Sequence, residues 1–212
     1  MRTNILIAFI FLCLIHKGYS QDSLSIKMSI IDEYKEKILS EKTTFFSVGF
    51  PLKWYTDNDS IHYYFKDNRL VFIEHYSNQK IDGDTWVIGA IDYRRVFFMQ
   101  NKLVLEEQYS KSFEEHYRWD ENKKGYIDIY NNITDDRNYY DFISGKELAI
   151  VSRSIEAPET QSDSLLNLTE WYYHDISKYK STGKDAFRHI LKEINENEFT
   201  FPDSLIMPYS EE

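Results

Sequence analysis

A phrase of 13 residues occurs twice in this chain, and it restricts the possible fold more than any other feature. FKDNRLVFIEHYS at residues 65–77 and FMQNKLVLEEQYS at residues 98–110 align without a gap at an offset of 33 residues. Each copy places turn-forming residues, including an Asn, between aromatic and aliphatic runs. This pattern is typical of a β-hairpin. The chain is therefore predicted to contain repeated antiparallel hairpins.

The turn residues predict which side chains face one another in the first hairpin. A two-residue turn at positions 67–68 suits Asp and Asn, because both tolerate positive φ. It pairs Phe65 with Leu70 and Tyr63 with Phe72. Aromatic side chains then lie on both faces of the hairpin, whereas a sheet with one face in water normally alternates apolar and polar residues.

The second hairpin is predicted in the same way, with its turn at positions 100–101. That turn pairs Phe98 with Leu103 and sets Arg95 opposite Glu106. Opposite charges that face each other across strands stabilise a sheet by a few tenths of a kcal/mol. This coincidence of charge supports the predicted register.

Two further hairpins follow from runs at 113–119 with 126–130 and at 139–142 with 148–151. In the last one, Gly145 suits a left-handed backbone and Phe142 is expected to pair with Leu148. Short strands at this spacing predict an α+β fold built on an antiparallel β-meander of about eight strands. An open sheet and a partial barrel both remain possible.

Helical periodicity flanks the predicted sheet. Apolar residues at spacings of three and four predict a helix over residues 22–42, and similar patterns predict helices over 165–179 and 187–194. We expect these helices to pack on the sheet. The predicted organisation is an N-terminal helix at 21–44, the meander at 45–155 with its two similar hairpins, and a helical segment with a tail at 156–212, all in one domain.

Residues 1–20 have the layout of a secretory signal peptide. A basic start at Arg2 is followed by an apolar run from Ile5 to Ile15 and by small residues before a cleavage site after Ser20. The single cysteine, Cys13, would leave with the signal, so the mature chain has no thiol. A lipid anchor on Cys13 is disfavoured, because the residue before it is not small. We expect a secreted or periplasmic protein.

The charge of the chain argues against nucleic acid as a partner. There are 25 basic and 35 acidic residues, and no dense basic cluster occurs. Nucleic-acid binders neutralise phosphates with clustered Lys and Arg. Past the signal, no apolar stretch approaches the length of about 20 residues that a membrane-spanning helix needs.

Motifs of catalysis and metal binding are missing from the sequence. There is no Gly-x-Ser-x-Gly elbow, no His-Glu-x-x-His and no phosphate-cradling glycine pattern. Glu114 with His116, and Asp-rich turns such as that at 57–59, have ligand-forming residue types but are far more typical of exposed strands and turns. We therefore expect no metal, no cofactor and no nucleophile site, and we name no catalytic residue.

The surplus of aromatic residues is the feature that points to binding, since 17% of the chain is Phe, Trp or Tyr. If one face of the sheet is uncovered, it would form an aromatic surface for a peptide, a glycan, an apolar ligand or a protein. The alternative is that other elements cover both faces. The candidate ligand-binding residues are Trp54, Tyr55, Tyr63, Tyr64 and Trp86.

Three functions are consistent with these observations. The first is a non-enzymatic exported binding or protein-interaction module. The second is a carboxylate-dependent hydrolase of the envelope or the extracellular space, which would need two acids in a cleft. The third is an envelope assembly or structural factor that offers a sheet edge to a partner strand.

Overall fold

The computed structural model describes residues 23–52, 59–82, 86–116, 128–158, 166–178 and 181–209. The chain divides into two units, Met1–Ser40 and Glu41–Glu212. The predicted signal peptide, Trp54 and Tyr55 lie outside the described residues, as does the side chain of Trp86.

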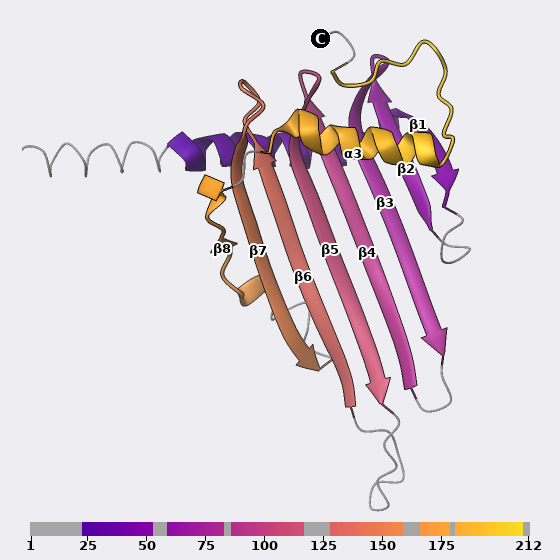
Figure 1. The fold of residues 1–212 in the computed structure, drawn as a ribbon, viewed down its shortest axis with the longest axis vertical. Helices are drawn as coiled ribbons and strands as arrows, with labels where there is room; N and C mark the ends of the chain where they lie inside the picture. The colour runs from indigo at the N-terminus through magenta and orange to yellow at the C-terminus, as the bar shows by residue number, and fades with distance from the viewer. Residues whose placement is uncertain are drawn as a thin grey trace, which may run out of the picture. The chain divides into compact units, whose positions relative to one another are not determined.

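The second unit is built on one sheet whose strands follow one another in chain order (Figure 1). Every neighbouring pair is antiparallel. The prediction of an antiparallel meander of about eight strands is therefore confirmed, and of the two predicted forms the sheet is the open one. The strands are β1 (Phe46–Pro51), β2 (Ser60–Lys66), β3 (Arg69–Asp82), β4 (Trp86–Met99), β5 (Lys102–His116), β6 (Asp128–Tyr140), β7 (Glu147–Pro158) and β8 (Tyr172–Tyr173).

The predicted turns form, but the predicted register holds only next to them. Asp67 and Asn68 have φ of 50° and 62°, which matches a two-residue turn with both central residues left-handed. Phe65 faces Leu70 as expected. The register then shifts by one residue, so Tyr63 faces Ile73 and the predicted pairing of Tyr63 with Phe72 is wrong.

The same irregularity recurs in the second hairpin. Phe98 faces Leu103 as predicted, but the register shifts between Phe97 and Phe98. Arg95 consequently faces Glu107, and the predicted pairing with Glu106 is wrong. A β-bulge adds one unpaired residue to one strand and leaves no signal in a pattern of period two.

The third hairpin at this end of the sheet also carries a register shift, between Tyr139 and Tyr140. Tyr140 faces Glu147, so the connection is longer than predicted, and Phe142 lies in the turn rather than opposite Leu148. Gly145 has a φ of 70°, as predicted.

Helix α3 (Gly183–Glu196) crosses one face of the sheet (Figure 1). Its start is fixed by a capping box, in which Thr182 accepts from the backbone N–H of Asp185 and the Asp185 side chain accepts from Thr182. Gly183 permits close contact with β5, because a Cβ there would lie 2.8 Å from the Leu103 carbonyl oxygen. The buried core of this unit comprises Leu52, Ile61, Tyr63, Phe65, Leu70, Ile73, Val96, Phe98, Leu103, Tyr140, Phe187, Ile190 and Ile194.

The chain after α3 packs on this core. The Phe199 ring stacks on Phe50 with centroids 4.2 Å apart, and Phe201 meets Tyr63 edge-on at 4.9 Å. The Tyr209 hydroxyl accepts a hydrogen bond from the backbone N–H of Leu103 at 3.0 Å. Residues 199–209 are therefore part of the folded unit.

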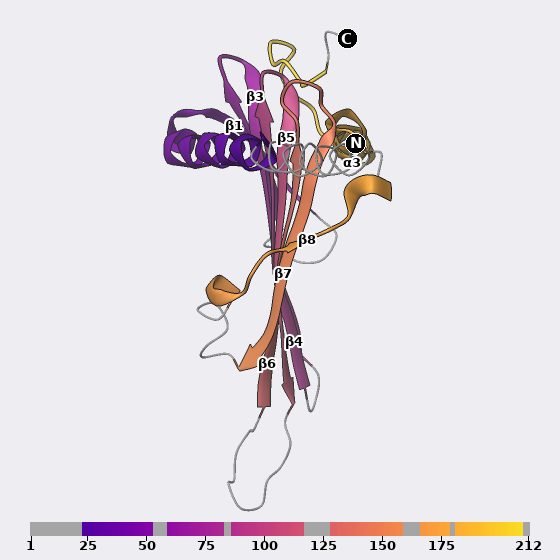
Figure 2. The same cartoon turned by 90° about the vertical axis from the view of Figure 1, so that its left-hand side faces the viewer.

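The helix predicted over residues 165–179 is wrong for most of its length. Residues 166–178, called the strap from here on, contain a helical turn at 166–168, strand β8 and the 3-10 helix Ile176–Lys178. Figure 2 shows the strap passing around the β7 edge, with its first turn on the face opposite α3.

The predicted N-terminal helix is confirmed and runs over residues 23–41, so that all but its last residue belongs to the first unit. The 3-10 turn Lys42–Thr44 follows it in the chain. Within this helix, Lys35 lies 4.0 Å from Asp32 and 3.4 Å from Glu36. None of the helices in the described part of the chain is long and apolar enough to cross a membrane.

Candidate functional site

A row of alternating charges crosses the middle of the sheet on the face opposite α3. Glu74 on β3 faces Arg95 on β4, Arg95 faces Glu107 on β5, and Glu107 faces Arg137 on β6. Strand side chains alternate between faces, so Val96 next to Arg95 points into the core below α3. Glu74 thus stands beside one guanidinium group and Glu107 between two, which favours this register.

The next row along the same strands is aromatic and then charged. Tyr76 faces Tyr93, and Tyr93 faces Tyr109. Their ring centroids are 4.9 Å apart for the first pair and 6.3 Å apart for the second. Tyr109 faces Asp135, and Asp135 faces Arg153.

A hollow of about 280 Å³ opens where these two rows meet. This volume lies just below the range of roughly 300–1,000 Å³ that is usual for small-molecule sites. The hollow is called the polar hollow below, and it is lined by Tyr93, Arg95, Glu107, Tyr109, Asp135 and Arg137.

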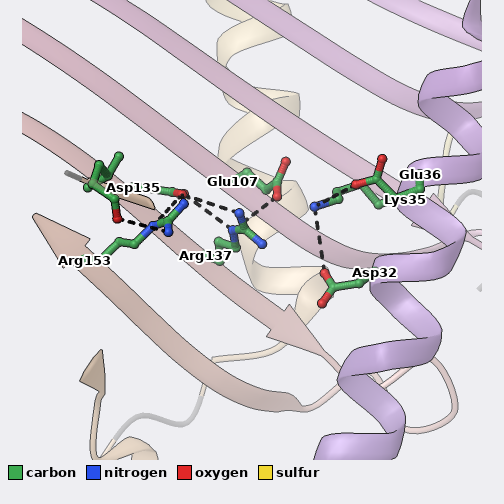
Figure 3. A network of polar contacts seen from close by, with 8 residues as sticks. Asp32, Lys35, Glu36, Glu107, Asp135, Arg137 and Arg153 are labelled. Atoms are coloured by element: carbon green, nitrogen blue, oxygen red, sulfur yellow. Dashed lines mark hydrogen bonds and ion pairs between the residues drawn. The ribbon is translucent and has the colours of Figure 1, made fainter. Parts of the chain in front are cut away.

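The carboxylates of the polar hollow are bound by arginines (Figure 3). Arg137 lies 3.3 Å from Glu107 and 3.4 Å from Asp135, and Arg153 donates to Asp135 at 2.9 Å. Burial alone would lower the pKa of Arg137, but the charges of Glu107 and Asp135 outweigh it and raise that pKa above its usual range. Arg137 therefore stays a cation at any physiological pH.

Trp171 of the strap closes one side of this network. The guanidinium carbons of Arg137 and Arg153 lie 4.4 and 4.3 Å from the centre of its ring. Arg153 also donates to the Leu166 carbonyl oxygen at 3.3 Å. Cation–π contacts at this range contribute on the order of 1 kcal/mol each. They fasten the strap to the sheet beside the polar hollow.

Arg95 is held differently from Arg137 and Arg153. Its Nε donates to Glu74 at 3.3 Å, and its guanidinium lies 5.7 Å from the centre of the Tyr93 ring. Its two terminal nitrogens have no hydrogen-bond partner among the described residues. The Arg95 side chain is 34% exposed, against 19% for Arg137 and 13% for Arg153.

The carboxylate of Glu74 is shared among several donors. It accepts hydrogen bonds from Lys42 Nζ at 2.8 Å and from the Tyr64 hydroxyl at 3.5 Å, in addition to the one from Arg95. Burial and the charge of Glu74 raise the pKa of Tyr64, so its hydroxyl remains a donor. Tyr64 thus supports the charged row from beside it.

The sequence-predicted ligand residues are not gathered in one place by the described part of the structure. Tyr63 is fully buried in the core, while Tyr64 points to the opposite face and bonds Glu74. Ligand binding by Trp54, Tyr55 and Trp86 stays a prediction, because their side chains lie outside the described residues.

Sequence reasoning missed Arg95, Arg137 and Trp171 as members of a site. The alternation of Glu and Arg on β3 to β6 was present in the sequence, but it aligns only when the bulges are known. Nothing in the sequence indicated that Trp171 contacts the sheet, because the spacing of apolar residues over 165–179 predicts a helix there.

A second polar pair lies on the α3 face at the β7 edge. The Ser152 hydroxyl and the His174 Nε2 are 2.7 Å apart. A serine nucleophile also needs a group that orients its histidine and donors for an oxyanion. Asp136 faces Ser152 across the strands and lies close enough to His174 for their charges to interact, but in the described residues no carboxylate hydrogen-bonds His174. The contact therefore joins the strap to β7.

Under α3, the Nε2 of His75 and the hydroxyl of Tyr63 are buried without a hydrogen-bond partner. Burial lowers the pKa of His75 despite the nearby carboxylate of Glu193, and burial together with Glu193 raises the pKa of Tyr63. Both groups are therefore neutral near pH 7. The space beside His75 is only about 10 Å³, which is room for one water at most.

Among the side chains that the structure describes, no group of three or more His, Cys, Asp or Glu is placed to hold a metal ion. Glu114 and His116 are not among these side chains. Comparison of the chain with protein-family models, with curated proteins and with solved structures finds no match in any of the three.

Proposed function

We propose that this protein is a non-enzymatic binding module that holds a small ligand in the polar hollow. The observation that carries the proposal is the hollow itself, formed by six side chains from three adjacent strands. Binding sites usually combine apolar surface with a few fixed polar groups, and sites on rigid strands hold those groups in place. Here Tyr93 and Tyr109 supply the apolar surface and the charged row supplies the polar groups.

The arrangement of the acids favours binding over carboxylate-dependent hydrolysis. A hydrolase of that kind needs one carboxyl group that can give up a proton and another that is free to attack or to activate water. In the polar hollow, Asp135 is held by two arginines and Glu107 by at least one. Carboxylates engaged in this way position the arginines.

The assembly role remains a second candidate, on one observation. Strand β8 pairs with only Val151 and Ser152 of β7, and no other described strand pairs with the outer edge of β7 at residues 153–158. An open edge of this kind can accept an extended segment of a partner.

A fragment screen by ligand-observed NMR tests the proposed function. A fragment of about 12 non-hydrogen atoms that gains about 0.3 kcal/mol per atom binds with a Kd on the order of 1 mM, which this method detects. We expect hits whose signals weaken in the Tyr93→Ala variant, which removes one wall of the polar hollow. The matched Tyr172→Ala variant changes an exposed tyrosine of the strap and should retain the hits.

Two results of the screen would contradict the proposal. One is the absence of any hit with a chemically varied set. The other is a set of hits that Tyr93→Ala leaves unchanged while its thermal unfolding shows a folded protein.

We also propose that the chain is exported, on the basis of the signal-like residues 1–20. Edman sequencing of the protein from its native host should begin at or near Gln21. A protein that retains Met1 would remove this part of the proposal and leave the polar hollow unaffected.

A further inference from the structure

We infer that the ligand of the polar hollow is an anion, and that both terminal nitrogens of Arg95 bind its carboxylate or phosphate group. The inference rests on the proposed function and adds the chemical class of the ligand. It starts from the geometry of Arg95, which uses one of its three guanidinium nitrogens on Glu74.

The planar end of a guanidinium presents two parallel N–H donors that match the two oxygens of a carboxylate or phosphate. In Arg153 both terminal nitrogens are used, one on Asp135 and one on the strap, and in Arg137 one terminal nitrogen is used on Asp135. In Arg95 they have no partner within the described chain, and the side chain remains 34% exposed beside the polar hollow.

The charges that are linked around the polar hollow are unequal in number. Four cations share three carboxylates. The cations are Lys42, Arg95, Arg137 and Arg153, and the carboxylates are Glu74, Glu107 and Asp135. Among these described contacts the cations outnumber the carboxylates by one, in a chain whose net charge is −10. A bound anion would be a further partner for these cations.

The surface beside Arg95 indicates what else the ligand contains. The Tyr93 ring lies next to the Arg95 guanidinium, and Tyr76 and Tyr109 extend this aromatic surface on the neighbouring strands. Tyrosine rings stack well on planar groups. The volume of about 280 Å³ limits the ligand to a small molecule. The expected ligand is a small oxyanion attached to a planar ring.

Three probes test this assignment on the purified protein. Phenylacetate carries a carboxylate, phenyl phosphate carries a phosphate, and phenylacetamide has nearly the shape of phenylacetate without the charge. We expect at least one of the two anions to bind tenfold or more tightly than phenylacetamide in an NMR titration. The preference should shrink as ionic strength rises, because the paired charges are partly exposed.

Variants identify the residue responsible. Arg95→Gln should remove the preference for anions, and Arg95→Lys should reduce it, since an ammonium offers no two-donor fork. The control Arg188→Gln changes an arginine of α3 that is 68% exposed, and it should keep the full preference. Thermal unfolding of each variant establishes that it is folded, and Arg95→Lys retains the charge should Arg95→Gln fail to fold.

The outcomes separate this inference from the proposed function. Equal affinity for phenylacetamide and both anions would overturn the anionic class, and so would a preference that survives both changes at Arg95. Hits in the fragment screen that depend on Tyr93 would still support a binding module in either case. Whether phenylacetate or phenyl phosphate binds more tightly decides between a carboxylate and a phosphate ligand.

Discussion

At the scale of single residues, Gly145 shows how much a backbone conformation alone contributes to the stability of the fold. Its φ is 70°, and a Cβ placed there would meet nothing within 4 Å. Its N–H donates to the Asp141 carbonyl oxygen, and its own carbonyl oxygen accepts from Gly183 at the start of α3. The residue is therefore constrained by conformation and not by space.

We expect Gly145→Ala to lower the free energy of unfolding by about 1 kcal/mol, the usual cost of a left-handed backbone with a Cβ. Gly145→Asn should recover much of this loss, since Asn tolerates that region. Urea denaturation with a constant m-value measures both. A loss well above 3 kcal/mol for alanine would mean that the substitution disturbs the contact with α3 as well.

Elements differed in how far the sequence predicted them. The predictions were correct for the N-terminal helix, for the helix containing Phe187 and for the two-residue turns at Asp67 and Gln100. Each of these elements depends on local periodicity or on turn chemistry. The bulges were not predictable in this way. They arise where strands must change which face they bury, and that depends on the whole sheet.

The candidate site was largely invisible in the sequence for the same reason. A shift of one residue moves Glu107, rather than Glu106, opposite Arg95, and only then does the alternation of charge extend over four strands. The helix predicted over residues 165–179 does not form, because tertiary contacts of the strap override the helical spacing of its apolar residues. Trp171 is held by Arg137 and Arg153, which come from different strands.

For the whole molecule, the segment after α3 is a structural part of the core. Phe201 contacts Phe50 at 5.3 Å, Tyr63 at 4.9 Å and Phe65 at 6.2 Å between ring centroids. After α3, the chain thus returns to cover the aromatic side chains of β1 and β2.

We expect Phe201→Ala to destabilise the protein by about 3 kcal/mol, at the lower end of the usual range for this change because the side chain is partly exposed. The control Leu168→Ala removes a side chain that is 80% exposed and should change stability by less than about 0.5 kcal/mol. Chemical denaturation of both variants tests this. A Phe201→Ala protein as stable as the control would show that residues 199–209 do not hold the core together.

The duplicated hairpin phrase has a consequence for how a gene of this kind can grow or shrink. Because the strands follow in chain order with alternating direction, loss of β4 and β5 together would bring β3 beside β6 still antiparallel. Glu74 would then face Arg137, and the alternation of charge would survive. Loss of a single strand would instead set Glu74 beside Glu107 in a parallel pair. Duplication or deletion by whole hairpins is thus the change in length that this sheet tolerates.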